Sequence, residues 1–213
     1  MSEFMHIRYV GIKSSFTEGF VKGLVSDLLP GCRSVYVEVG KEVDTGNTSL
    51  GRIVQMLYNG GKGNHVSFRT NKLYEFTVHA RPSGNSVHLT ISLLNSPLET
   101  SSKIAADLVE RCKGVYLSVH PEYAIGGWEG LVEGKGVTYK SDIFWLNFYG
   151  PQLVKKIGLA KLKTVPYGTI EELADSGVML MRGRITSENS EHHEEMRKHL
   201  FGGKSLFDGL LGR

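Results

Sequence analysis

Two histidines come closest, by type and spacing, to a site that could do chemistry. The segment 73–94 predicts a β-hairpin in which His79 lies opposite His88, and two facing imidazoles can chelate a transition metal if a third ligand approaches, for example His120. Their neighbours include Thr77 and Glu75, which are ordinary for a solvated sheet surface. A small metal-dependent or hydrolytic enzyme using His79 and His88 is therefore the alternative function, and a solvated face is the simpler interpretation.

Two other patterns imitate known sites without meeting their requirements. His192, Glu195 and His199 share one face of an expected helix, but the metalloprotease motif needs two histidines four residues apart with a glutamate after the first. Residues 202–205, GGKS, resemble the end of a phosphate-binding loop, but Lys198 stands where that motif needs its first glycine. We reject both as catalytic or cofactor sites.

Nucleophile patterns are also missing from the sequence. It contains no G-x-S-x-G motif, and neither Cys32 nor Cys112 sits in a recognisable catalytic setting. Both cysteines stand beside apolar residues, which favours buried free thiols over a disulfide. The residues thus indicate a binding protein with no catalytic residue, cofactor or metal, rather than an enzyme.

Composition limits the class of partner. The chain has 213 residues, a net charge of +3 and a pI of 8.8, with lysine and arginine scattered, so we expect no direct nucleic-acid binding. No run approaches the roughly 18 apolar residues of a membrane-spanning helix, and Met1–Val10 lacks the features of a signal peptide. We therefore expect a cytoplasmic protein with no membrane partner.

Periodicity predicts the elements of the first part of the chain. Helical spacing predicts helices over residues 15–29 and within 48–61, and a short strand is expected at 34–39. In the hairpin, the two apolar sets share a face only if paired residue numbers have an odd sum, and the turn suggests 167. That register pairs Val78 with Leu89 and Phe76 with Ile91.

The later elements are predicted by caps, glycines and apolar runs. Ser96–Glu99 has the form of a capping box, and the helix that follows is expected to end at Gly114, before a strand at 115–119. The segment 120–136 contains five glycines and is expected to be a loop. The remaining expected elements are a strand at 143–149 covered on both faces, a short helix at 151–158, a hairpin turning near 174–176 and a helix over 187–200.

Helices alternate with hairpin-type strands, which favours an α+β fold with a largely antiparallel sheet under helices. A chain of this length can form one domain over residues 1–213. The pattern of a helix, a glycine and then VYxxV occurs twice, so we expect two related halves of about 1–95 and 96–213.

Residues 144–158, FWLNFYGPQLVKKIG, and 169–183, TIEELADSGVMLMRG, resemble a known family. They are similar to the C-terminal half of bacterial immunity proteins of type VI secretion and polymorphic toxin systems, especially the immunity protein 52 family. In that pattern an aromatic WLNxxGP strand enters a short helix and then a hairpin with an apolar last strand. The matching residues are Trp145, Leu146, Asn147, Gly150, Pro151 and Gly158, whereas Ser176-Gly177 stands where a glycine pair is more usual.

This resemblance implies a cytoplasmic protein without catalysis that binds and neutralises a cognate toxin. In these families the toxin is typically a nuclease of the restriction-endonuclease fold. The aromatic run then forms part of the core, and toxin specificity lies on loops and helix surfaces. Whether the free protein is a homo-oligomer is left open.

Charge selects the expected partner-binding residues. An inhibitor that mimics DNA over its whole surface would be strongly acidic, and this chain is not, so capture of a basic nuclease must use a local patch. The candidates are the late hairpin, the glutamates of the 188–195 helix and the glycine-rich loop. We favour the loop, where Trp128 is an aromatic anchor, although it can instead pack beneath the loop. The named candidates are Glu122, Trp128, Glu129, Glu133, Glu171, Glu172 and Asp175.

Overall fold

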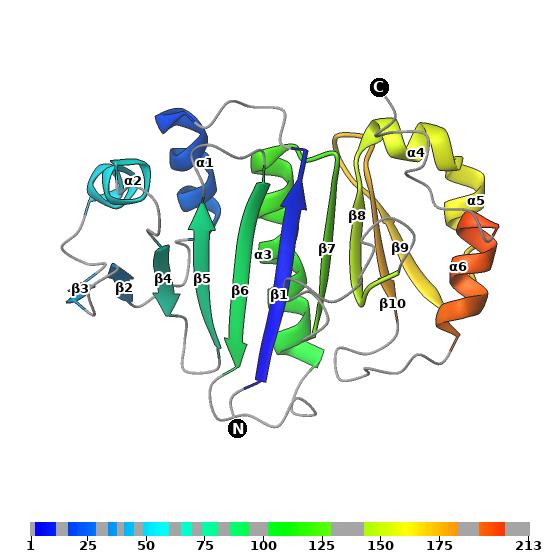
Figure 1. Ribbon diagram of the computed structural model, residues 1–213, viewed down its shortest axis with the longest axis horizontal. Helices are drawn as coiled ribbons and strands as arrows, with labels where there is room; N and C mark the ends of the chain where they lie inside the picture. The colour runs from blue at the N-terminus through cyan, green and yellow to red at the C-terminus, as the bar shows by residue number, and fades with distance from the viewer. Residues whose placement is uncertain are drawn as a thin grey trace. The chain divides into compact units, whose positions relative to one another are not determined.

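The structure is a computed structural model, and it divides into two compact units, Met1–Pro121 and Glu122–Arg213 (Figure 1). Each unit combines helices with antiparallel strands, so the expected α+β class is confirmed. The relation between two halves divided near residue 95 stays a prediction. The residues described are 3–11, 17–28, 34–37, 41–44, 49–59, 65–69, 74–80, 86–93, 102–128, 143–182 and 192–202.

The sheet of the first unit has the strand order β3-β2-β4-β5-β6-β1, and each neighbouring pair is antiparallel. The hairpin register is confirmed, because Val78 pairs with Leu89 and Phe76 with Ile91. β1, β3 and β4 were not among the expected strands. The strands are β1 (Glu3–Val10), β2 (Ser34–Val37), β3 (Lys41–Asp44), β4 (His65–Arg69), β5 (Tyr74–Ala80) and β6 (Ser86–Leu93).

Three helices belong to this unit: α1 (Glu18–Leu28), α2 (Leu50–Asn59) and α3 (Ser102–Val119). Hydroxyls cap the first two, since Thr17 Oγ1 accepts from the Phe20 amide at 3.2 Å and Ser49 Oγ from the Arg52 amide at 3.3 Å. In Figure 1, α1 and α3 lie behind the strands. The expected capping box at 96–99 lies outside the described residues.

The prediction of a strand at 115–119 is wrong, because these residues form the last turns of α3. The helix continues through Gly114 instead of ending there. This glycine lies where α3 passes α1, and a Cβ at its position would stand 3.6 Å from Asp27 Cβ. The apolar stripe continues across the glycine at helical spacing. Its buried members are Leu108, Val109, Cys112, Val115, Tyr116 and Val119.

Arg111 links these two helices. Its Nη1 donates to the carbonyl of Leu28, the last residue of α1, at 3.2 Å, and its Nε donates to Asp107 at 3.2 Å. We expect Arg111→Ala to lower the free energy of unfolding by about 1 kcal/mol, because the end of α1 loses a charged donor. Urea denaturation followed by far-ultraviolet circular dichroism measures this.

The matched control is Asp107→Ala, which removes the ion pair within α3 but leaves the donor to Leu28 in place. An exposed pair of this kind contributes about 0.3 to 0.5 kcal/mol. Equal losses in the two variants would contradict the proposed role of Arg111 at the end of α1.

Cys112 is a buried free cysteine whose carbonyl accepts from Tyr9 Oη at 3.1 Å. Burial raises the pKa of the Cys112 thiol from its ordinary 9.0 to about 12, and burial also raises the pKa of Tyr9. The unfolded chain releases these protons at a lower pH than the folded chain does. The stability due to the neutral thiol is therefore complete below pH 9.0 and is lost as the pH rises towards about 12.

We expect the urea midpoint of the first unit to fall steadily once the pH exceeds 9.0. Cys112→Ala should show a shallower decline, because one of the raised groups is removed. Circular dichroism in urea at a series of alkaline pH values measures both proteins. An identical pH dependence for the variant would show that the thiol does not contribute.

In the second unit the strand order is β7-β8-β10-β9, again with antiparallel neighbours. The expected helix at 151–158 and the expected late hairpin are confirmed, whereas α5 was not expected. The helix expected over 187–200 is confirmed from His193 onward, and residues 183–191 lie outside the description. The elements are β7 (Tyr123–Trp128), β8 (Leu146–Tyr149), α4 (Pro151–Ile157), α5 (Leu159–Lys163), β9 (Gly168–Glu172), β10 (Val178–Arg182) and α6 (His193–Phe201).

The expected glycine-rich loop needs correction at its beginning, where Tyr123–Trp128 forms β7 and pairs with β8. Because this segment contains two glycines, its sequence is more typical of a loop than of a strand. The structure gives a reason for one of them, because a Cβ on Gly127 would stand 3.5 Å from Phe144 Cδ1. Residues 129–142 lie outside the description.

The aromatic run behaves as expected, because all four residues of β8 are buried and the strand is covered on both faces. Tyr149 belongs to a core formed with α4, α5, α6 and β10, whose other members include Leu153, Leu180 and Met196. Leu146 and Phe148 lie on the opposite face of the strand and are fully buried.

Asn147 is the buried polar residue of this strand, with 1% of its surface exposed. Its Oδ1 accepts from the Phe144 amide at 2.9 Å, and its Nδ2 donates to the carbonyls of Phe144 at 2.7 Å and Leu180 at 3.3 Å. One side chain thus closes the bend before β8 and also joins β8 to β10. This explains a polar residue in an otherwise apolar run.

Candidate partner-binding groove

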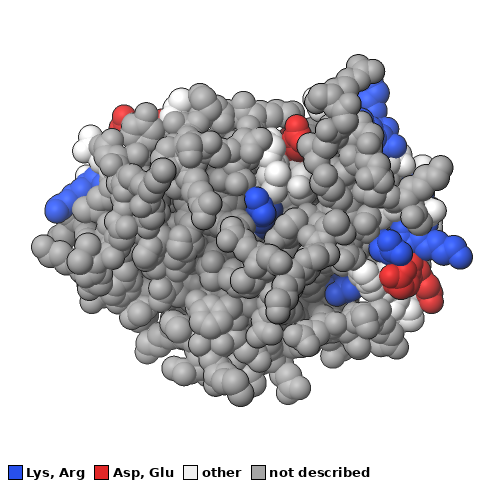
Figure 2. Space-filling view, viewed as in Figure 1, with Lys and Arg blue, Asp and Glu red and all other residues white. Residues whose placement is uncertain are grey.

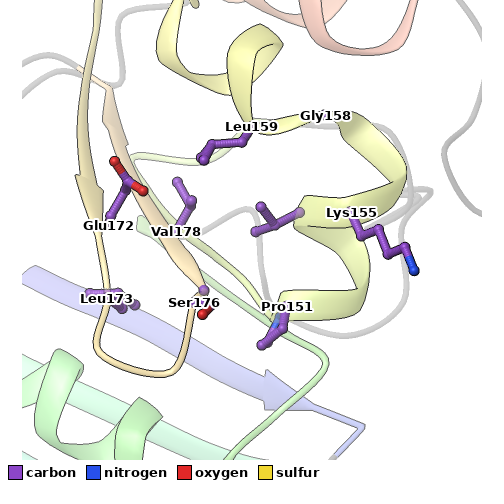
Figure 3. Close-up of a pocket in the computed structure, with 10 residues that line it drawn as sticks. Pro151, Lys155, Gly158, Leu159, Glu172, Leu173, Ser176 and Val178 are labelled. Atoms are coloured by element: carbon purple, nitrogen blue, oxygen red, sulfur yellow. The ribbon is translucent and has the colours of Figure 1, made fainter.

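A groove of about 390 Å³ lies on the second unit, between α4 with the start of α5 and the β9–β10 hairpin (Figure 3). Its apolar lining is Pro151, Val154, Leu159, Leu173 and Val178. Lys155 and Glu172 are its charged lining residues. In Figure 3, Leu159 and Val178 extend into the same space, whereas the Lys155 side chain points away from it.

Glycine and proline position the helical wall. Pro151 occupies the first turn of α4, where its missing amide costs no hydrogen bond. Gly158 has φ 94° and ψ 120°, a conformation that L side chains rarely adopt, and it separates α4 from α5. Leu159 follows at once and is 36% exposed, which is high for a large hydrophobic side chain.

A tight turn builds the opposite wall. Asp175 Oδ1 accepts from the Gly177 amide at 2.9 Å, and the Leu173 amide donates to the Gly177 carbonyl at 2.9 Å. Ser176 has φ 66°, so a non-glycine residue occupies the left-handed region here. Asp175 therefore has a structural role in the turn, in addition to any role in binding.

The helical wall of the groove belongs to a basic segment, whereas the hairpin wall comes from a segment with three acidic residues. Residues 151–167 contain four lysines and no acidic residue, and all four lysines are exposed. Lys163 Nζ forms an ion pair with Glu172 Oε1 at 2.6 Å, so the groove's carboxylate is already partly neutralised. In Figure 2, the acidic residues drawn in red form small groups, and blue lysine or arginine atoms lie beside the group at the right.

The structure describes only some of the expected partner-binding residues. Glu122 is exposed, and its carbonyl accepts from the Gly150 amide at 2.8 Å, next to the start of α4. Trp128 ends β7, but its side chain lies outside the description, as do Glu129 and Glu133. Their roles in binding stay a prediction.

On the late hairpin, Glu171 and Glu172 are consecutive residues of β9 and so lie on opposite faces of the strand. Of these two and Asp175, the structure brings only Glu172 into the groove. Sequence reasoning missed Leu159 and Lys155 as candidates. A leucine directly after the helix-ending Gly158 was the available signal, because a helix that restarts there exposes its first residue.

The histidines near α6 have contacts within the second unit. His192 stacks on Tyr167, with ring centroids 3.6 Å apart and planes 12° apart. His199 Nε2 lies 3.0 Å from the Lys161 carbonyl. Glu188 and Glu191, which were expected to continue this surface, lie outside the described residues.

The expected pair of His79 and His88 is confirmed as a register pair, and the neighbouring strand adds His65 opposite His79. Three neighbouring strands therefore each carry a histidine at positions that pair across the sheet. Among the side chains that the structure describes, no three His, Cys, Asp or Glu residues could hold a metal ion. The side chains of His65, His79 and His88 are outside that description.

Comparison with known proteins shows a shared fold. The type VI secretion system (T6SS) protein PA0821 of Pseudomonas aeruginosa matches with a TM-score of 0.57 and 13% identity, covering 94% of this chain and 73% of that one. A chain in the structure of the toxic C-terminal tip of CdiA from Pseudomonas aeruginosa in complex with its immune protein matches with a TM-score of 0.37 and 14% identity over 61% of this chain and 88% of that one. A TM-score of that size does not establish a common fold.

No protein-family model and no curated protein matches the chain. The resemblance to the immunity protein 52 family therefore stays a prediction. Among the helices described, none combines the length and apolar character needed to cross a membrane.

Proposed function

We propose that this chain is an immunity protein that binds and neutralises a protein toxin of a type VI secretion or related polymorphic toxin system. The observation that carries the proposal is the fold shared with a T6SS protein over 94% of the chain. The sequence resemblance supports it from a separate direction, since residues 144–158 and 169–183 form β8, α4 and the β9–β10 hairpin. These elements include both walls of the groove.

The resemblance implies a toxin that is a nuclease of the restriction-endonuclease fold, and we propose that the chain binds this toxin in the cytoplasm. We propose that the protein acts by occupying the toxin's surface and has no catalytic role of its own. The groove offers what a binding surface needs, which is exposed apolar area surrounded by charged groups. The acidic and aromatic candidates of the glycine-rich loop stay a separate proposal for toxin contact, based on the sequence alone.

Co-expression tests this proposal. Each gene next to the one encoding this chain is expressed from an inducible promoter in a host lacking both genes, with and without the chain. We expect one neighbour to stop growth and the chain to restore it, and the two proteins to co-purify in a stoichiometric complex. A toxic neighbour that the chain neither binds nor counteracts would refute the proposal.

A folding-defective variant supplies the control for this experiment. Asn147→Asp places a carboxylate against buried carbonyls and should weaken protection strongly, because the second unit is destabilised. The control for a surface charge reversal is Lys22→Glu, which changes an exposed residue of α1. This variant should protect cells as the wild type does.

A second candidate function is transition-metal binding by the first unit, favoured by the register row of His65, His79 and His88. Three imidazoles are a known set of zinc ligands, and neighbouring strands bring residues within reach of one ion. Isothermal titration of the metal-free protein with Zn²⁺ tests it. Binding with a stoichiometry of one that is lost in His79→Gln supports the site, and no difference between the two proteins refutes it.

A further inference from the structure

We infer that the groove of the second unit takes a segment of the partner protein in which a large apolar side chain is flanked by aspartates or glutamates. This inference rests on the proposed function, because it assumes that the molecule bound in the groove is a protein. It adds the chemistry of the segment that is recognised. It also reverses the expectation that the partner is captured by acidic residues of this chain.

The apolar part of the inference comes from exposed side chains. Among the side chains that the structure describes, only Leu159 and Tyr167 are exposed large hydrophobics, and Leu159 lies in the groove. Val154 and Val178 line the groove beside it and belong to the core, so the surface around Leu159 is held by packed elements. A leucine or phenylalanine of a partner would remove this apolar area from water.

The charged part comes from the lysines. Lys155 lines the groove, and Lys161 is next to it, since a Cβ on Gly158 would lie 3.9 Å from Lys161 Cβ. Lys163 is paired with Glu172, so it adds no net charge there. Lys155 and Lys161, for which the described residues supply no ion pair, thus belong to the helical wall of an apolar groove, and carboxylates that flank an apolar anchor complement their charge.

Nucleic acid is the other polyanion that lysines attract, and the groove is poorly suited to it. Single-stranded nucleic acids bind by stacking bases on aromatic side chains, and the groove has no aromatic residue among those that line it. An apolar lining without aromatic side chains fits a protein segment better.

Synthetic peptides test the chemistry directly. The probe is a fluorescein-labelled peptide of sequence EELEELEE, and the two comparison peptides are KKLKKLKK and EEGEEGEE. Binding to the full chain is followed by fluorescence anisotropy and by the methyl resonances of Leu159 and Val178. We expect EELEELEE to bind most tightly, to shift both methyl groups and to weaken with added salt.

Two groove variants and two matched controls assign the binding to this surface. Leu159→Asp should weaken EELEELEE binding by about tenfold or more, because the apolar contact is replaced by a like charge. Lys155→Glu should weaken it by about threefold to tenfold. Tyr167→Asn removes the other exposed hydrophobic with a residue that tolerates φ 61°, and Lys22→Glu reverses a charge on the first unit; both should bind as the wild type does.

Several outcomes would overturn the inference. These are equal binding of EELEELEE and KKLKKLKK, unchanged binding by Leu159→Asp, or methyl shifts produced by a short DNA strand that competes with the peptide. The toxin experiment separates this failure from failure of the proposed function. If Leu159→Asp protects cells fully, the groove is not the surface that contacts the toxin, but the proposed function still stands. If the wild type fails to protect cells while the peptide results hold, only the proposed function is refuted.

Discussion

Asn147→Asp should destabilise the second unit by about 3 to 5 kcal/mol, because it buries a charge that has no positive partner. In the wild type the Asn147 amide nitrogen donates to two carbonyls, at 2.7 Å and 3.3 Å. A carboxylate there would place negative oxygen against both acceptors, at a position that is 1% exposed.

Tryptophan fluorescence measures this unit selectively, because both tryptophans, Trp128 and Trp145, lie in residues 122–213. Asn147→Ala is the comparison, with an expected loss of about 2 to 3 kcal/mol from the carbonyls and amide left without partners. The introduced carboxyl has a raised pKa in the folded state, so its neutral form is favoured there. The deficit of the Asp variant should therefore shrink as the pH falls towards about 4, and a deficit that is constant with pH would contradict the account.

The second large effect is expected at Leu180, where truncation to alanine should cost about 2 to 5 kcal/mol. Leu180 is fully buried at the centre of the core of the second unit. Gly168 faces it so closely that an added Cβ would stand 2.5 Å from Leu180 Cδ1 and 3.1 Å from both Met196 Cε and Val165 Cγ1. Gly168→Ala alone should therefore cost about 1 to 3 kcal/mol by overpacking.

The two changes should compensate each other, because removing the leucine creates the space that the new methyl group needs. We expect the double variant to be about 1 kcal/mol more stable than the sum of the single losses predicts. Gly158→Ala combined with Leu180→Ala is the control, since the Cβ at position 158 meets only Lys161 Cβ at 3.9 Å and its cost comes from the backbone. Additive losses at 168 and 180 would rule out direct contact between them. If the double variant is unfolded, Leu180→Val allows the same comparison.

Local patterns predicted those elements whose signal is contained in a few neighbouring residues. The β5–β6 register followed from the alternation of apolar residues and the turn length, and the burial of β8 followed from its run of apolar residues on both parities. β1 has the same kind of alternation, with Ile7 and Tyr9 buried, and could have been predicted from it.

Elements that depend on a distant neighbour were predicted less well. Residues 115–119 are rich in β-branched and aromatic side chains, yet α1 packs against them and the helical stripe continues. β7 contains glycines that favour a loop locally, and the backbone pairing with β8 decides its conformation. In both cases tertiary contacts overrode local propensity.

The candidate site depended still more on tertiary structure. Counting charges along the chain drew attention to Glu171, Glu172 and Asp175 as one acidic patch. The strand separates the first two onto opposite faces, and Asp175 closes the turn. The groove joins residues 151–159 to residues 172–178, and no local pattern shows that these segments lie together.

The position of the two consecutive glutamates has a consequence for aggregation. β9 is at one end of the strand order, and no described strand pairs with its outer edge, where another strand could be added. In amyloid-type stacking, identical chains align in parallel and in register, which would place Glu171 and Glu172 of each copy next to their own counterparts. Repulsion between these columns of carboxylates would oppose fibril growth from this edge at neutral pH, most of all at Glu171, because Glu172 is paired with Lys163.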